Sequence, residues 1–271
     1  MAEFLETCEA AARVGGQVLL EWRERFEVRE KGPSDLVTQA DTAAQESIRS
    51  LVLDRYPTHA FVGEEDTAAH APTGGYCWFV DPLDGTMNYV HGVPHYATSV
   101  ALARGETLLA AAVFDPNSQE CFTAARGEGA YLNGRKLRTS AAAELSRALV
   151  AASFSAKVRP DSPEISQFER AMLECQGVRR TGSAALNMCY LAAGRFDTFW
   201  SLSTKIWDVA AGVLLVEEAG GVISDIDGQP FTFARPHPVA SANPGLHEQF
   251  LALLSAANRP NGGKPGVLDG V

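Results

Sequence analysis

The stretch at residues 78–92, W-F-V-D-P-L-D-G-T-M-N-Y-V-H-G, constrains the fold more than any other part of the chain. Its first three residues are apolar and typical of a short buried strand. Asp81 precedes Pro82, which favours extended backbone at Asp81 and marks the expected end of the strand there. The turn D-G-T at Asp84 adds a second carboxylate, a glycine and a hydroxyl. Acidic side chains at the end of a rigid element indicate a functional site.

Composition limits what kind of protein this is. With 271 residues, 46% of them hydrophobic, the chain can bury a substantial core. It contains no apolar run of about eighteen residues, and its start, M-A-E-F-L-E-T-C-E, lacks the features of a signal peptide, so we expect a cytoplasmic protein with no membrane partner. The net charge of -10 argues against nucleic acid as a partner, but allows a small phosphorylated substrate if metal cations lie between the negative charges.

Hydrophobic periodicity and turn residues predict a mixed fold. Helices are expected at residues 2–26, 38–55, 162–176, 184–193, 206–219 and 244–254. Strands are expected at residues 59–62, 78–81, 149–154, 178–180, 196–202, 222–225 and 239–242, with an antiparallel meander over residues 96–138. The mixture favours one layered α/β or α+β domain over residues 1–256. Residues 257–271, rich in glycine and proline, are expected to form a flexible tail.

Four carboxylates lie at the ends of predicted elements: Glu64, Asp81, Asp84 and Asp208. No cysteine or histidine accompanies them at ligand spacing, and the five cysteines of the chain form no C-x-x-C pair. An all-oxygen ligand set suits Mg²⁺ better than zinc. A lone aspartate at a helix start is more often a helix cap, and Asp41, Asp84 and Asp208 also fit that description.

Two short segments are candidates for binding a phosphate. Gly85 and Thr86 can open one helix, and Gly182, Ser183 and Ala184 stand just before another. The first backbone N–H groups of a helix have no partner within it and face outward toward an anion. Together with the carboxylates, these segments predict a phosphate pocket bridged by metal ions.

Spaced motifs give the chain a family resemblance. They are G-E-E at Gly63, D-P-L-D-G-T at Asp81 and W-D-V-A-A-G at Trp207, supported by D-L-V-T-Q-A-D at Asp35. In this order they resemble the inositol monophosphatase family, within the wider group that includes fructose-1,6-bisphosphatases. The similarity runs from the first predicted helix to about residue 256. It implies an αβαβα sandwich with a largely antiparallel sheet in the first half, a homodimer, and inhibition by lithium.

The resemblance also implies two or three Mg²⁺ ions. Glu64, Asp81 and the carbonyl of Leu83 would hold the first ion. Asp81, Asp84 and Asp208 would hold the second, and a third would lie near Glu64. Each ion would neutralise phosphate charge and act as a Lewis acid.

The catalytic roles follow from the same resemblance. Thr86, oriented by Asp41, would position the attacking water, so no enzyme nucleophile is needed. Glu65 would support the metal ligands from behind. The histidines at 91 and 95 are assigned to packing or hydrogen bonding, and no G-x-S-x-G motif indicates a serine hydrolase.

Substrate choice depends on a later part of the chain. Ser201 stands where inositol-selective relatives commonly carry an acid, and Lys205 replaces a residue that is usually not cationic. A lysine there favours a second anionic group on the substrate, whereas a serine weakens a preference for inositol. The residues expected to contact substrate are Asp84, Gly85, Thr86, Gly182, Ser183, Ala184, Ser201, Lys205 and Asp208.

The predicted function is an Mg²⁺-dependent phosphatase acting on a small phosphorylated polyol or sugar, with inositol monophosphate first. Fructose 1,6-bisphosphate, histidinol phosphate and a nucleotide 3'-phosphate are the alternative substrates. A hypothesis of another class is a regulatory binding scaffold that keeps the fold.

Overall fold

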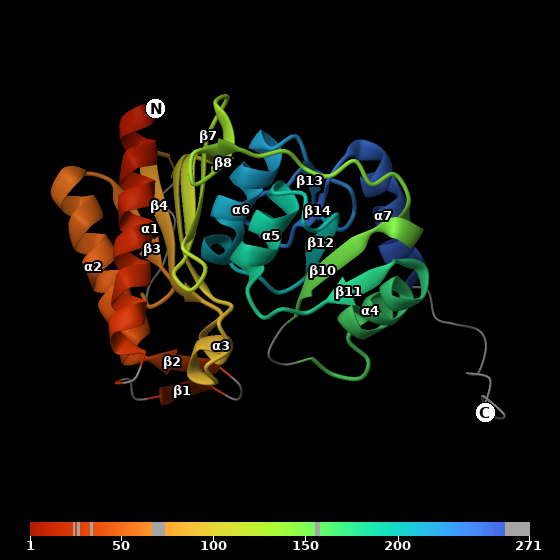
Figure 1. The fold of residues 1–271 in the computed structure, drawn as a ribbon, viewed down its shortest axis with the longest axis horizontal. Helices are drawn as coiled ribbons and strands as arrows, with labels where there is room; N and C mark the ends of the chain where they lie inside the picture. The colour runs from red at the N-terminus through yellow and green to blue at the C-terminus, as the bar shows by residue number, and fades with distance from the viewer. Residues whose placement is uncertain (24, 26–27, 33–34, 67–73, 155–157, 258–271) are drawn as a thin grey trace.

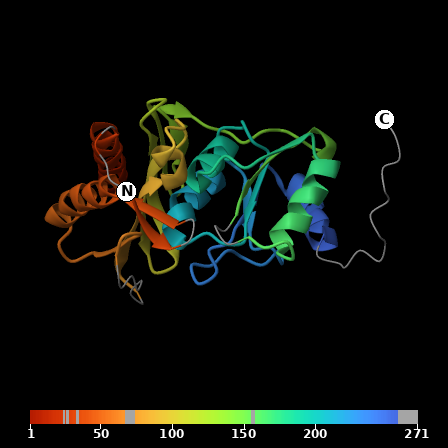
Figure 2. The ribbon, with the colours of Figure 1, turned by 90° about the horizontal axis from the view of Figure 1, so that it is seen from below.

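The computed structural model describes residues 1–23, 25, 28–32, 35–66, 74–154 and 158–257, so the predicted tail from residue 258 onward lies outside the described part. Figure 1 shows five layers from left to right, and Figure 2 shows the same order from below. The layers are α1 (Ala2–Trp22) with α2 (Gln39–Arg55), a seven-stranded sheet, α5 (Ala184–Ala192) with α6 (Ile206–Glu218), a five-stranded sheet, and α4 (Pro163–Glu174) with α7 (Pro244–Ala257). The predicted αβαβα sandwich is confirmed.

The larger sheet holds the predicted meander. Its strands, in spatial order, are β3 (Ala60–Gly63), β4 (Tyr76–Asp84), β5 (Ala97–Arg104), β6 (Thr107–Asp115), β7 (Glu120–Ala125), β8 (Gly129–Leu132) and β9 (Arg135–Lys136). Only the β3–β4 pair is parallel, and every later pair in this sheet is antiparallel. The expectation of a largely antiparallel sheet in the first half is therefore confirmed.

The smaller sheet comes from the second half of the chain. Its order is β11 (Gly177–Arg179), β10 (Leu149–Ser153), β12 (Thr198–Ser201), β14 (Val239–Ser241) and β13 (Val222–Ser224). The first three strands are parallel, and β14 runs antiparallel to both its neighbours. Among the described residues, no helix is long and apolar enough to cross a membrane.

The structure corrects two local expectations. The strand predicted to end at Asp81 continues to Asp84, with an irregular register between these two residues. Pro82 lacks an N–H for the ladder, and the bulge accommodates it while its carbonyl accepts a hydrogen bond from Thr98 Oγ1 at 2.9 Å. A hairpin of β1 (Val28–Gly32) and β2 (Asp35–Thr38), which the sequence analysis missed, precedes α2.

Side chains of β4 alternate between two apolar cores. Trp78 and Val80 pack with α1 and α2, whereas Cys77 and Phe79 pack with α5 and α6. This is the period of two expected of a strand buried on both faces. Asp81 shares the parity of Phe79, so it faces the layer of α5 and α6.

Helices α5 and α6 approach each other closely at Gly212. A Cβ atom on Gly212 would lie 2.6 Å from Met188 Cβ and 2.7 Å from Met188 Sδ. Met188 is fully buried, so it has little room to move away. The absence of a side chain at Gly212 therefore sets how near the two helices can lie.

We expect Gly212→Ala to lower the free energy of unfolding by about 1–3 kcal/mol, because overpacking outweighs a gain in helix propensity of about 1 kcal/mol. Urea denaturation measures the change. Gly245→Ala in α7 is the matched control, since a Cβ there would meet its nearest atom, Asn243 Oδ1, only at 3.7 Å. Equal stability of Gly212→Ala and wild type would contradict this account of the packing.

Candidate active site

Strand pairing places Glu64 beside Asp81. In the parallel ladder Val62 faces Phe79, and both side chains lie in the core beneath α5 and α6. Two residues further along, Glu64 and Asp81 occupy the same face. The Glu64 N–H donates to the carbonyl of Val80 at 3.1 Å, so the pairing continues past the end of β3.

Asp208 reaches the same place from the first turn of α6. The Lys205 N–H donates to Asp208 Oδ2 at 2.7 Å, which caps the helix. Glu64, Asp81 and Asp208 each offer a carboxylate oxygen, and these atoms all lie within 4.8 Å of one another. Asp81 is only 2% exposed, and the other two are half-buried.

The charges of this cluster repel one another. Burial raises the pKa of Asp81 well above its usual value, and the nearby charges of Glu64, Asp84 and Asp208 raise it further. Burial and the Glu64 charge likewise raise the pKa of Asp208, against the lowering effect of the Lys205 N–H. A hard divalent cation with oxygen preference fits this donor set, because it would neutralise converging carboxylates.

Asp84 is the last residue of β4, and its side chain bonds the first residues of α5. It is not one of the three clustered carboxylates. Its Oδ2 accepts hydrogen bonds from the Ser183 hydroxyl and from the Ala185 N–H, the latter at 2.7 Å, and its Oδ1 accepts from the Ala184 N–H at 3.2 Å. Burial raises the pKa of Asp84 to about 6, although these hydrogen bonds pull it down. The amides expected to face a phosphate therefore bind a carboxylate of the protein here.

Thr86 lies beside Asp41, the residue expected to orient it, and also beside the carbonyl of Leu83. Thr86 Oγ1 lies 3.4 Å from Asp41 Oδ1 and 3.1 Å from the carbonyl oxygen of Leu83. Asp41 Oδ2 accepts from the N–H of Thr38 at 2.8 Å, which completes a capping box on α2. Asp41 therefore caps α2 and also contacts Thr86.

Two glycines of the expected phosphate segments are required by close approach. Gly85 caps α3 (Thr86–Val90) at φ 103°, and a Cβ there would lie 3.1 Å from the carbonyl of His95. Gly182 has φ 94°, and a Cβ there would lie 2.8 Å from Asn88 Nδ2. Left-handed backbone of this kind favours glycine.

The substrate-selecting residues differ in exposure. Ser201 is fully buried at the end of β12, and its Oγ accepts from the Ser203 N–H at 3.3 Å. Lys205 is exposed at the N-cap position of α6.

Glu65 follows Glu64, and its N–H donates to Gln45 Oε1 at 3.0 Å. The expected packing role of His95 agrees with its ring lying 5.7 Å from that of Tyr190.

Sequence analysis missed the residues that surround these groups. Asn88 Nδ2 donates to the carbonyls of His95 at 2.7 Å and Thr181 at 2.9 Å, and so ties together two distant segments. Gln45 and Asp66 contact the segment that carries Glu64. The acidic run G-E-E-D was a signal for Asp66, but nothing in the sequence marked Gln45 or Asn88.

Comparisons with known proteins find relatives that cover most of the chain. A curated inositol-1-monophosphatase of Rhizobium meliloti is 44% identical over 88% of each chain. A Nus factor SuhB of Pseudomonas aeruginosa is 41% identical, over 94% of this chain and 96% of the relative.

Solved structures show the same fold. The extragenic suppressor protein suhB of Bartonella henselae superposes with a TM-score of 0.87 at 34% identity, covering 93% of this chain and 98% of that chain. An inositol monophosphatase from Anabaena gives a TM-score of 0.84 at 31% identity, covering 94% and 96%. The profile of the inositol monophosphatase family matches residues 1–259. The resemblance inferred from spaced motifs is thus confirmed, and the chain belongs to the inositol monophosphatase family.

Proposed function

We propose that the protein is an Mg²⁺-dependent phosphatase that hydrolyses a small phosphorylated polyol or sugar, with inositol monophosphate as the first candidate. Phosphoric monoester hydrolysis is the activity of the family to which the chain belongs. The observation that carries the metal requirement is the convergence of Glu64, Asp81 and Asp208 within 4.8 Å. Such a cluster favours a cation, and a phosphate monoester brings further negative charge that a cation would offset.

The carboxylates divide into two ligand sets in this proposal. Glu64, Asp81 and the Leu83 carbonyl would hold one ion, Asp81, Asp84 and Asp208 would hold another, and a third would lie near Glu64. Asp84 accepts three hydrogen bonds from the start of α5. An ionised carboxylate has about four lone-pair sites, so Asp84 can serve a cation while keeping these contacts. Bound Mg²⁺ supplies Lewis-acid activation and charge neutralisation.

Thr86 and Asp41 orient the water in this proposal. The Thr86 hydroxyl donates toward Asp41 Oδ1, which leaves Thr86 Oγ1 as an acceptor for a proton of the attacking water. That arrangement aims a lone pair of the water at phosphorus, in line with the departing alkoxide. Glu65 supports Glu64 from the next position in the chain. In the proposed step the water oxygen would form a bond to phosphorus as the P–O bond to the alcohol breaks, and the proton lost by the water would balance the one that the departing alkoxide takes up, so no covalent enzyme intermediate forms.

Two residues near the site bear on the choice of substrate. Ser201 is buried, whereas Lys205 is exposed beside the cluster and can meet a second anionic group. Fructose 1,6-bisphosphate and a nucleotide 3'-phosphate would use that charge, whereas the amine of histidinol phosphate would prefer an acid. Family membership supports a homodimer and lithium inhibition in the same way, and we place the protein in the cytoplasm.

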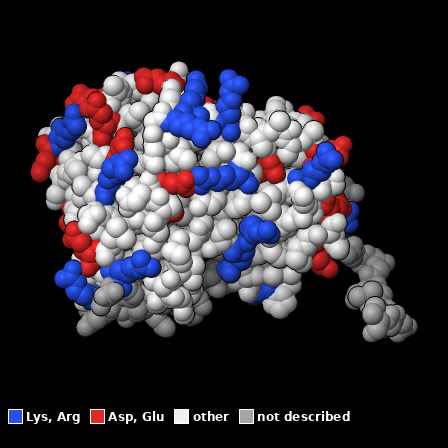
Figure 3. Space-filling view, in the orientation of Figure 1, with Lys and Arg blue, Asp and Glu red and all other residues white. Residues whose placement is uncertain are grey.

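A second candidate function is a regulatory binding scaffold. The observation that favours it is that one relative, 41% identical, is named Nus factor SuhB. The net charge of -10 is unfavourable for nucleic acid as the partner. On the face shown in Figure 3, lysine and arginine side chains gather at the upper edge over β7 and β8. Phosphatase turnover by the purified protein would establish that it is an enzyme, and an enzyme can also have a binding role.

We expect phosphate release from a panel of phosphate monoesters to require Mg²⁺, and to be fastest with inositol monophosphate. The panel contains inositol monophosphate, fructose 1,6-bisphosphate, histidinol phosphate and adenosine 3',5'-bisphosphate, each assayed with Mg²⁺ or with EDTA. The order of rates identifies the substrate. A complete lack of Mg²⁺-dependent turnover on every compound would reject the proposed enzyme function.

Asp208→Asn should reduce kcat by on the order of 100-fold or more, because it removes a metal ligand while keeping the shape of the side chain. Steady-state kinetics at saturating Mg²⁺ measures the loss. Circular dichroism should show an unchanged fold, since Asn can still cap α6. Turnover near the wild-type rate would reject the assignment of Asp208 to the second ion.

The metal-free protein should lose stability as pH rises from about 4 to 6. Burial raises the pKa of Asp84 from 3.8 to about 6 in the folded state, so folding favours the protonated form. The stabilisation is complete below the unfolded pKa, and its loss by pH 7 amounts to about 3 kcal/mol. Thermal denaturation in EDTA, with Asp84→Asn as the comparison, measures this contribution together with the effect of the Asp84 charge on Asp81. Parallel pH profiles of the two proteins would contradict it.

A further inference from the structure

The turn at residues 63–66 carries Glu64 into the carboxylate cluster. Its two ends are joined twice, since the Asp66 N–H donates to the Gly63 carbonyl at 3.2 Å and the Gly63 N–H donates to Asp66 Oδ2 at 2.9 Å. The N–H of Glu64 donates to Val80, the residue before Asp81. The backbone of Glu64 is therefore fixed against β4 by a turn that Asp66 closes.

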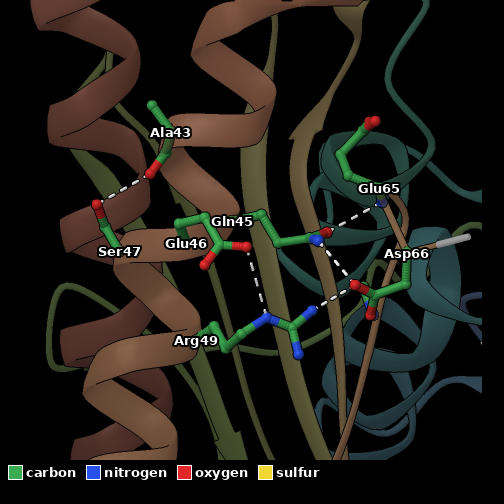
Figure 4. Close-up of polar contacts among 8 residues, drawn as sticks. Ala43, Gln45, Glu46, Ser47, Arg49, Glu65 and Asp66 are labelled. Carbon is green, nitrogen blue, oxygen red and sulfur yellow. Dashed lines mark hydrogen bonds and ion pairs between the residues drawn. The ribbon is translucent and has the colours of Figure 1, made fainter.

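Helix α2 holds this turn from the other side, as Figure 4 shows. Gln45 Oε1 accepts from the Glu65 N–H at 3.0 Å, and Gln45 Nε2 donates to Asp66 Oδ1 at 3.2 Å. Arg49 Nη2 forms an ion pair with the same oxygen of Asp66. The contacts of Gln45 complete the turn, so that all four N–H groups of residues 63–66 have partners.

Packing keeps the two side chains of α2 in place. Gln45 is 3% exposed and lies against Gly63, where a Cβ would come within 2.2 Å of Gln45 Oε1. The guanidinium of Arg49 lies 4.2 Å from the centre of the Phe61 ring. These contacts hold both side chains against the turn.

These contacts matter because the turn carries Glu64, whose carboxylate lies close to other carboxylates. The Glu64 carboxylate lies within 4.8 Å of oxygens on Asp81 and Asp208. Where these carboxylates are ionised and no cation is bound, their like charges repel, and movement of the turn away from β4 would relieve the repulsion. A connecting segment after a short strand is otherwise among the easiest parts of a fold to move.

We propose that Gln45, Arg49 and Asp66, which we call the α2 clamp, are positioning residues that hold Glu64 ready for a metal ion and so set the metal affinity. The inference rests on the proposed function, because it assigns Glu64 as a metal ligand. None of the three clamp residues touches the ion or the substrate in this proposal. Their effect passes through the backbone of residues 63–66.

Arg49 separates this proposal from a simple effect of charge. Loss of a positive charge near a cation site would tighten metal binding by long-range electrostatics. The clamp predicts the opposite, because the turn would lose its ion pair and Glu64 its fixed position. Arg49→Met is the variant of choice, since it keeps an apolar stem over Phe61 and removes every donor.

The test measures Mn²⁺ binding to the full chain by electron paramagnetic resonance, without substrate. We expect Arg49→Met to weaken Mn²⁺ binding on the order of ten-fold. Hydrogen exchange in EDTA should show faster exchange of the Glu65 amide. Arg49→Lys, which can still pair with Asp66, should restore much of the affinity. In turnover assays the half-saturating Mg²⁺ concentration should rise, whereas kcat at saturating Mg²⁺ should stay close to wild type.

Two further variants complete the design. Glu46→Gln is the matched control, because Glu46 is 65% exposed on the same helix and contacts Arg49 Nε only at 3.7 Å; its Mn²⁺ affinity should match wild type. The double variant Arg49→Met/Asp66→Asn should bind Mn²⁺ about as well as whichever of the two single variants binds it less tightly. The effects should not add, because each substitution breaks the same ion pair.

The outcomes distinguish the two proposals. Equal or tighter Mn²⁺ binding by Arg49→Met, with a folded protein, would overturn the α2 clamp while leaving the phosphatase proposal intact. A wild-type protein that binds Mn²⁺ but turns over no phosphate monoester would reject the phosphatase proposal, and the Arg49 series would still decide the clamp. A lower kcat in all clamp variants, with Mn²⁺ affinity unchanged from wild type, would also overturn the α2 clamp.

Discussion

The parallel pairing of β3 with β4 is the interaction on which the site depends. It is the single parallel pair in the larger sheet, and its register sets Glu64 beside Asp81 on one face. A slip of one residue would turn the Glu64 side chain to the opposite face, toward α1 and α2. The apolar pairs Val62 with Phe79 and Phe61 with Trp78 hold that register, so core packing fixes the position of the acids.

The N-termini of α5 and α6 contribute the other contacts of the acidic residues. Asp84 accepts the first amides of α5, and Asp208 lies in the first turn of α6. The positive end of a helix dipole stabilises a carboxylate, which offsets part of the repulsion within the cluster. The acids are held together by partners that lie in three layers of the sandwich.

Local signals in the sequence predicted much of this arrangement. A run of three consecutive apolar residues marked β4, the helix start expected at residue 38 is the N-cap position of α2, and spaced acidic motifs gave the family. Interactions over long separations were not visible. The continuation of β4 past Pro82 depends on pairing with β5, and the contacts of Asp84 lie about a hundred residues further along the chain. Gln45 resembles any polar residue of an amphipathic helix until β3 is placed against it.

Asn88 has a mechanical consequence for the pocket. Its amide nitrogen uses its hydrogens on the carbonyls of His95 and Thr181, and its side chain fills the space that a side chain at Gly182 would need. Asn88 itself lies in α3, so these two hydrogen bonds join α3 to the segment that follows it and to the segment that leads into α5. A rearrangement that separates α3 from the start of α5 has to break the bond from Asn88 to Thr181, which couples the positions of the two expected anion-facing segments.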